Sequence, residues 1–183
     1  MAVVGLDPAR ASLDVARKKR HSAAVTWVHG DANQLVGRGL AVDLVMMTGN
    51  VAQVFVLDED WACTLDVAFA CLRPGGWLVF ETRRPEARDW EQWDVNPTTV
   101  NVPGGQTVVV TRTVTNVAMP LVTFETTTIV GGEVVPSSST LRFRQRDDVE
   151  TDLRDHGFEV LDVRDAPDRP GKELVFIARR PSA

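Results

Sequence analysis

The side chains of this chain best suited to bind a ligand are polar residues that directly follow apolar runs. Asp7, Asp31 and the segment Thr48-Gly49-Asn50 occupy such positions. An ionised carboxylate only accepts hydrogen bonds, so Asp7 suits the vicinal hydroxyls of a ribose and Asp31 suits an exocyclic amine such as that of adenine. Each aspartate alone is more often a helix cap or a turn residue. Together, at neighbouring strand ends, they favour a nucleoside site.

The elements that must position these side chains alternate between apolar runs and amphipathic stretches. We expect strands over 2–6, 25–29, 42–47 and 77–81, and helices over 9–20 and 59–72. The basic residues Arg17–Arg20 are expected in the last turn of the first helix, where they complement its dipole. This alternation predicts a parallel sheet with right-handed crossovers, which binds ligands at the carboxyl ends of its strands.

The second half of the chain begins with a different pattern. Residues 106–117 and 121–130 are rich in Val and Thr, which predicts hairpin strands, and a further strand is expected over 139–146. In that last strand, apolar residues alternate with Arg142, Arg144 and Arg146, so we expect the arginines to form a solvated face.

The α/β pattern then returns. A helix that starts near Val149 and ends at Gly157 precedes strands over 158–163 and 174–178. No stretch between the two patterns is long enough to be a linker between independent domains. The chain is therefore predicted to be one α/β domain over residues 1–183, with residues 97–146 as an antiparallel β-rich lid insertion.

Composition excludes several classes of function. The 183 residues are 44% hydrophobic and 25% charged, as expected of a soluble globular chain. The net charge of −5 gives no positive field for a polyanion, so we expect no nucleic-acid partner. The sequence shows neither a long apolar run nor a secretory signal, so no membrane partner is expected and the predicted location is the cytoplasm.

Metal, disulfide and tyrosine chemistry are not indicated either. Cys63 and Cys71 are expected to be packing residues, and His21, His29 and His156 are too scattered to form a metal site. The chain contains no tyrosine, which excludes a mechanism that depends on a Tyr general acid.

The motifs above, with the turn Leu72-Arg73-Pro74-Gly75-Gly76 before a strand, resemble those of class I S-adenosylmethionine-dependent methyltransferases. The resemblance implies a Rossmann-like, mostly parallel sheet, S-adenosylmethionine as cofactor and a small molecule as methyl acceptor. It also implies that Asp7, with Pro8, binds the ribose and that Asp31-Ala32 meets the adenine. Thr48-Gly49-Asn50 would border the methionine end and the substrate.

For the acceptor, we expect substrate contacts from Gln53, Arg83 and Trp90. Asn50 and Gln53 suit an amine or a hydroxyl, and Arg83 suits an anion, with a solvated turn as the alternative for Arg83. Trp90 would line an apolar pocket under the lid, although aromatic residues in such places more often pack in the core. The sequence identifies no general base, so the catalytic residues stay unassigned.

One motif of the family is missing: the Gly-rich loop after its first strand. Gly104-Gly105 and Gly131-Gly132 do not replace it, because both lie among hairpin signals. The chain is thus predicted to be N-terminally truncated relative to the family's sheet order 3-2-1-4-5-7-6, with a central gap of about two strand spacings, or ~9.6 Å. Three arrangements would fill this gap: direct pairing of 2–6 with 42–47, a strand from a partner, or an upstream segment lost through a misassigned start codon. We favour the last, because Met1 lies where a strand is already under way. A homodimer is a further expected partner.

Two other classes of function stay open at this point. A non-catalytic or incomplete methyltransferase-like protein would bind no cofactor unaided. A nicotinamide-dependent oxidoreductase would share the acidic residue at a strand end, but it needs the same missing glycine loop.

Overall fold

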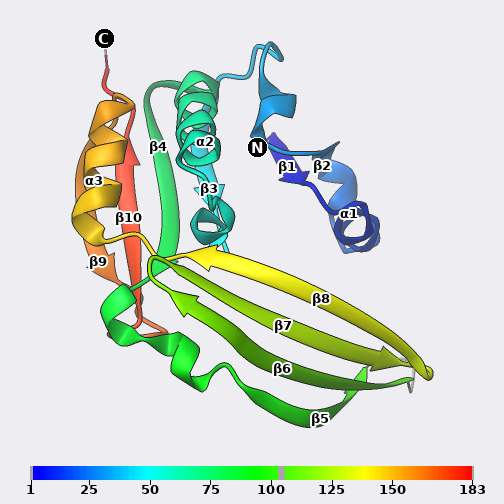
Figure 1. Ribbon diagram of the computed structural model, residues 1–183. Helices are drawn as coiled ribbons and strands as arrows, with labels where there is room; N and C mark the ends of the chain where they lie inside the picture. Colours follow the sequence, from blue (N-terminus) through cyan, green and yellow to red (C-terminus); the bar gives the residue numbers. More distant parts are fainter. Residues whose placement is uncertain (1, 103–105, 183) are drawn as a thin grey trace.

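The structure is a computed structural model, and it describes residues 2–102 and 106–182. Within these residues the strands form three sheets, with the orders β1-β2, β3-β4-β10-β9 and β5-β6-β7-β8 (Figure 1). The strands are β1 Val3–Asp7, β2 Val25–His29, β3 Val42–Met47, β4 Leu72–Arg83, β5 Val95–Val102, β6 Gln106–Ala118, β7 Leu121–Val130, β8 Glu133–Arg142, β9 Glu159–Asp165 and β10 Glu173–Arg179. The α-helices are α1 Arg10–Ala16, α2 Asp58–Cys71 and α3 Arg146–Asp155. Short 3-10 helices are η1 Ser22–Ala24, η2 Ala32–Leu35, η3 Val51–Val54, η4 Pro85–Ala87 and η5 Asp89–Gln92.

The four-stranded sheet β3-β4-β10-β9 contains the main core. β3 and β4 are parallel, and β10 runs antiparallel to both β4 and β9. Helices α2 and α3 contribute Trp61, Leu65 and Leu153 to the same apolar cluster as Phe80 and Phe176 of the sheet. The rings of Phe80 and Phe176 stack with centroids 5.1 Å apart. This packed core supports the loops that follow β3 and β4.

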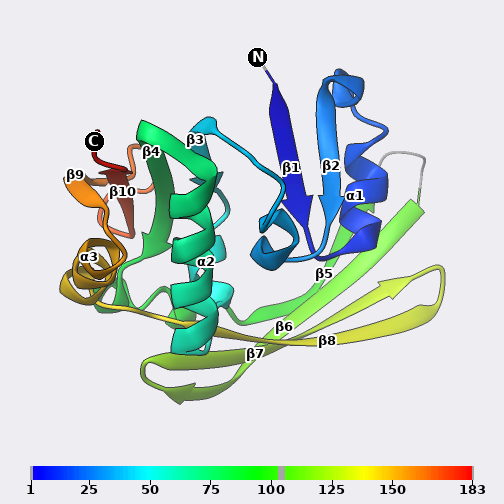
Figure 2. The ribbon, with the colours of Figure 1, turned by 90° about the horizontal axis from the view of Figure 1, so that it is seen from above.

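The N-terminal pair β1-β2 is parallel and carries α1, but it does not join the main sheet. Figure 2 shows β1 and β3 facing each other across a break, and within the described part of the chain neither strand pairs with the other. Of the three ways to fill the gap, direct pairing of 2–6 with 42–47 is therefore excluded. The pair contacts the rest of the molecule through η2, which lies against α2. At this contact the Cys63 thiol lies 3.1 Å from Asn33 Oδ1.

The antiparallel sheet β5-β6-β7-β8 extends below the carboxyl ends of β1 and β3 (Figure 2). It corresponds to the insertion predicted over 97–146, and its role as a lid stays a prediction. A small second core of Trp90, Val122 and Phe143 anchors its base. Gly104-Gly105 lie outside the described residues. The overall α/β architecture with an antiparallel β-rich sheet confirms the predicted fold class.

Two local expectations are wrong. Helix α1 ends at Ala16, because Lys18 and Lys19 make tight i to i−3 backbone hydrogen bonds that close the helix before the basic residues. The last hairpin strand ends at Arg142, and Arg146 already begins α3. Among the described helices, none has the length and apolar character needed to cross a membrane.

Candidate functional site

The first half of the predicted site lies at the carboxyl ends of β1 and β2. Asp7 and His29 are register partners in this parallel pair, which brings Asp7 and Asp31 to the same edge. Asp7 Oδ1 accepts the Ala9 backbone N–H at 2.7 Å, and Asp31 Oδ1 accepts the Asn33 N–H at 3.0 Å. Both aspartates therefore act as turn or cap residues. A carboxylate has about four acceptor positions, so each retains the capacity to bind a ligand.

Pro8 and Ala32 follow these aspartates directly. Pro8 is exposed and its carbonyl oxygen lies 3.0 Å from His29 Nε2, whereas Ala32 is half-buried at the start of η2. Their positions beside Asp7 and Asp31 are compatible with cofactor contacts, which stay a prediction.

The second half of the predicted site is the turn Thr48-Gly49-Asn50 after β3. Gly49 and Asn50 have φ angles of +74° and +60°, a conformation that Gly and Asn adopt more easily than other residues. Glu81 Oε1 accepts both backbone N–H groups of this turn. The Asn50 side chain is buried and donates from Nδ2 to Glu173 Oε1 at 2.9 Å. Among the described residues, its other polar atom, Oδ1, has no hydrogen-bond partner.

Gln53 and Arg83 lie together beside this turn. Arg83 Nη1 donates to Gln53 Oε1 at 2.8 Å, and the Arg83 guanidinium lies 5.2 Å from the centre of the Trp93 ring. Gln53 is completely buried. Burial lowers the pKa of the Arg83 guanidinium, and the negative charge of nearby Glu173 partly counteracts this lowering. The structure therefore brings these two predicted substrate residues together.

Trp90 is buried in the second core. Its ring meets Phe143 edge-on with centroids 4.7 Å apart, and Trp93 meets Phe124 in the same way at 5.4 Å. These contacts account for the aromatic residues as packing residues. A substrate contact for Trp90 stays a prediction.

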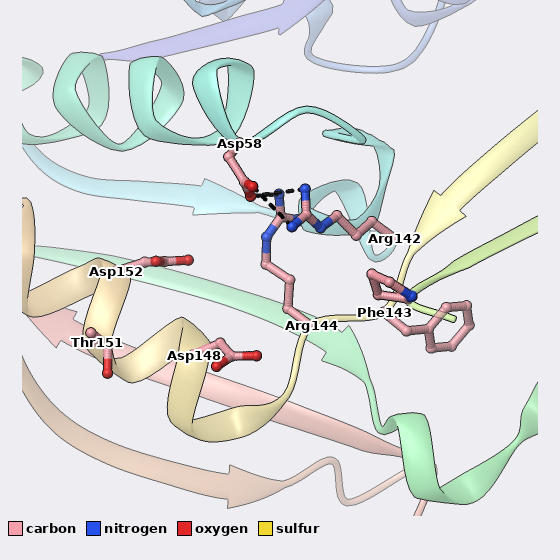
Figure 3. Close-up of a pocket in the computed structure, with 8 residues that line it drawn as sticks. Asp58, Arg142, Phe143, Arg144, Asp148, Thr151 and Asp152 are labelled. Atoms are coloured by element: carbon pink, nitrogen blue, oxygen red, sulfur yellow. Dashed lines mark hydrogen bonds and ion pairs between the residues drawn. The ribbon is translucent and has the colours of Figure 1, made fainter. Parts of the chain in front are cut away.

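Sequence reasoning missed that Arg142 and Arg144 turn inward and border a cavity (Figure 3). Arg144 is buried and donates to the carbonyl oxygens of Ala52 and Phe55 at 3.3 and 2.9 Å. Arg142 donates to Val56 O at 2.8 Å and contacts the carboxylate of Asp58. The prediction of a solvated arginine face is therefore wrong for Arg142 and Arg144, whereas Arg146 is exposed at the start of α3. Alternation alone does not reveal this arrangement, because the partner carbonyls lie far away in sequence.

These arginines border a cavity of about 330 Å³ between the base of β8 and α3. Its lining includes Asp58, Asp148, Thr151 and Asp152. None of the predicted cofactor or substrate residues lines it. The cavity and the strand-end residues are thus separate features of the molecule.

The predicted residues fall into two groups across the break in the sheet. Asp7 and Asp31 lie at the end of the β1-β2 pair, and the Thr48-Gly49-Asn50 turn, Gln53 and Arg83 lie beside the sheet that contains β3 and β4. Residues 2–102 and 106–182 contain no group of three or more His, Cys, Asp or Glu that would hold a metal ion.

Comparisons with known proteins agree with this architecture. A family model described as a methyltransferase domain matches residues 1–76. An S-adenosylmethionine-dependent methyltransferase from Clostridium acetobutylicum superposes with a TM-score of 0.77 at 13% identity, over 98% of this chain and 75% of that one. A sugar N-methyltransferase from Streptoalloteichus superposes with a TM-score of 0.77 at 18% identity, over 98% and 71%. No curated protein sequence matches the chain.

A third solved structure is the S-adenosylmethionine-bound amino pentose methyltransferase of calicheamicin biosynthesis from Micromonospora echinaspora. It superposes with a TM-score of 0.70 at 22% identity, over 97% of this chain and 73% of that one. These matches show that the chain has the fold of S-adenosylmethionine-dependent methyltransferases. The resemblance to that class is confirmed.

Proposed function

We propose that this chain transfers a methyl group from S-adenosylmethionine to an amino group of a small molecule. The observation that carries the proposal is the placement of Asp7 and Asp31 at adjacent strand ends of a methyltransferase fold. The amine is favoured because two of the similar structures are an amino pentose methyltransferase and a sugar N-methyltransferase.

The residues at the strand ends fit the nucleoside part of this cofactor. Asp7 would accept hydrogen bonds from the ribose hydroxyls, and Asp31, with Ala32, would meet the adenine amine and ring. A side-chain atom added at Gly49 would have no neighbour within 4 Å, so the turn after β3 leaves room for the methionine part.

The acceptor side of the site is polar and largely buried. When bound, the cofactor supplies an electrophilic methyl group on a sulfonium. Asn50, in the turn after β3, would help to orient the lone pair of the acceptor amine. Arg83, held by its hydrogen bond to the buried Gln53, would contact the rest of the acceptor from the same edge.

A second candidate is an incomplete methyltransferase-like protein that binds no cofactor unaided. The break between β1 and β3 favours it, because this break separates the two groups of candidate residues. The two candidates predict different binding behaviour of the unmodified chain.

Calorimetric titration with S-adenosylhomocysteine separates them. Binding by the unmodified chain is expected, and Asp7→Ala should weaken it about 10-fold to 150-fold, the equivalent of the roughly 1.5–3 kcal/mol of hydrogen bonds to a charged group. Asp14→Ala, an exposed carboxylate on α1, is the matched control and should leave the affinity unchanged. Failure of the unmodified chain to bind would favour the incomplete protein, and binding of NAD instead would favour an oxidoreductase.

A further inference from the structure

Two partly buried arginines, Arg83 at the end of β4 and Arg112 on β6, belong to none of the ion pairs formed by the described residues. Arg83 donates to Gln53 Oε1 at 2.8 Å. Arg112 donates to Thr126 Oγ1 at 3.5 Å. Because an arginine carries five N–H groups, these hydrogen bonds leave most donors of both guanidinium groups for a ligand.

Two aromatic rings join these arginines into one row. The Arg83 guanidinium lies 5.2 Å from the centre of the Trp93 ring. The Arg112 guanidinium lies 5.1 Å from the centre of the Phe124 ring. The two rings meet edge-on, with centroids 5.4 Å apart. An aromatic face holds a guanidinium in place without using its N–H donors, so the row presents two positioned cations.

The acids near Arg83 already bind other cations. Burial lowers the pKa of Arg83, nearby Glu173 and Asp89 raise it, and Arg112 is among the cations that lower it. Both acids form ion pairs with basic residues of the loop between β9 and β10, at 2.7 and 3.1 Å. These acids therefore leave Arg83 and Arg112 without a counter-charge of their own, and the two arginines lie close enough to repel each other.

The face of the antiparallel sheet that carries Arg112 turns toward the body of the protein. Arg112 pairs in register with Thr126 of β7, so alternation along β7 places Arg112 on the same face as Phe124 and Val122. Val122 is completely buried in the second core, against Trp90 and Phe143. The row of arginines and rings therefore lies between this sheet and the end of β4.

We propose that Arg83 and Arg112 bind an oxyanion, a carboxylate or a phosphate, carried by the methyl acceptor. Arginine binds both groups through parallel N–H donors. Arg83 is bonded to Gln53 in η3, directly after the Thr48-Gly49-Asn50 turn, so the anion would lie at the edge of the site proposed for the acceptor amine. That the anion belongs to a methyl acceptor rests on the proposed function, whereas anion binding by the two arginines does not.

Titration of the full chain with inorganic phosphate, without cofactor and at constant ionic strength, tests the anion site. We expect saturable binding of phosphate. Arg83→Gln and Arg112→Gln, which each remove one positive charge, should weaken it at least fivefold. Arg164→Gln removes an exposed arginine of β9 and is the matched control, which should leave binding unchanged. Acetate distinguishes the two sources: binding as tight as that of phosphate indicates a carboxylate, and weaker binding indicates a phosphate.

A conservative variant keeps the test valid if Arg83→Gln does not fold. Arg83→Lys retains the charge but loses the parallel donors, so it should still bind phosphate more weakly than the unmodified chain. The proposal is overturned if neither phosphate nor acetate binds, or if Arg164→Gln weakens binding as much as Arg83→Gln and Arg112→Gln.

Titration with S-adenosylhomocysteine separates this proposal from the proposed function. Binding of S-adenosylhomocysteine without binding of either anion would overturn the anion site and leave methyl transfer standing. Binding of an anion that depends on Arg83 and Arg112, without binding of S-adenosylhomocysteine, would support the anion site and overturn its assignment to a methyl acceptor.

Discussion

The N-terminal pair β1-β2 and the sheet β3-β4-β10-β9 are made from similar apolar strands, yet they are stabilised very differently. The sheet is packed by α2 and α3 around Phe80 and Phe176, which are completely buried. In the pair, every residue of β1 is only half-buried, and α1 contributes Leu13 as its buried side chain. Strand propensity therefore does not determine the stability of a region. What distinguishes the main sheet is the packing of one face against α2 and α3 and the pairing of its central strands β4 and β10 on both edges.

The largest effect is expected from a leucine in the main core. Leu65→Ala removes a side chain that is 0% exposed, and it should lower the free energy of unfolding by about 2–5 kcal/mol. Urea denaturation followed by tryptophan fluorescence measures this loss. A loss below about 1 kcal/mol would mean that the main sheet is not the stable part of the molecule.

The next largest effect concerns the connection between the main sheet and the antiparallel sheet. Arg144→Ala leaves the carbonyl oxygens of Ala52 and Phe55 without their charged donor, and it should lower the free energy of unfolding by roughly 1.5–3 kcal/mol. Arg144→Lys keeps the charge but loses the two-pronged geometry, so it should recover only part of this loss. Full recovery by lysine would show that charge alone matters at this position.

Leu13→Ala tests the N-terminal pair with a matched substitution. Leu13 is 1% exposed, almost the same as Leu65, but the β1-β2 unit should open locally before the main sheet unfolds. The global free energy of unfolding should fall by less than about 1 kcal/mol, while amide exchange in β1 and β2 accelerates. Equal losses for Leu13→Ala and Leu65→Ala would show that the two regions unfold as one unit.

The smallest effect is expected at Glu150 on α3. Hydrogen bonds from Arg146 and Arg154 lower the pKa of Glu150 in the folded chain. Ionised Glu150 therefore contributes to the free energy of unfolding above its pKa in the unfolded chain, about 4.3. This contribution is lost as the pH falls through its lower pKa in the folded chain. Glu150→Gln should cost less than about 1 kcal/mol at pH 7 and should flatten this part of the acid-unfolding curve. If Glu150→Gln leaves the acid-unfolding curve unchanged, Glu150 does not couple the stability of the chain to pH.

Local patterns predicted most of the elements. Sequence patterns predicted β1, β2, β3 and α2 to within a few residues of their observed ends. Each of these elements depends on the periodicity of neighbouring side chains. The errors lie mostly at element ends. Helix α1 and strand β8 end before Arg17–Arg20 and Arg146, and β4 and β8 begin at Leu72 and Glu133, earlier than the predicted 77 and 139; strand β5 was not predicted. Element ends depend on backbone turns and on distant partners such as the carbonyls of Ala52 and Phe55.

The sequence by itself determined the order of strands and helices, the aspartates at two strand ends and the resemblance to methyltransferases. Only the tertiary structure decided that β1 does not pair with β3, that Arg142 and Arg144 are turned inward, and that Gln53 and Arg83 lie in contact. The physical reason is the range of the interactions. Periodicity reports on residues a few positions apart, whereas strand pairing and buried polar contacts join residues that are distant along the chain.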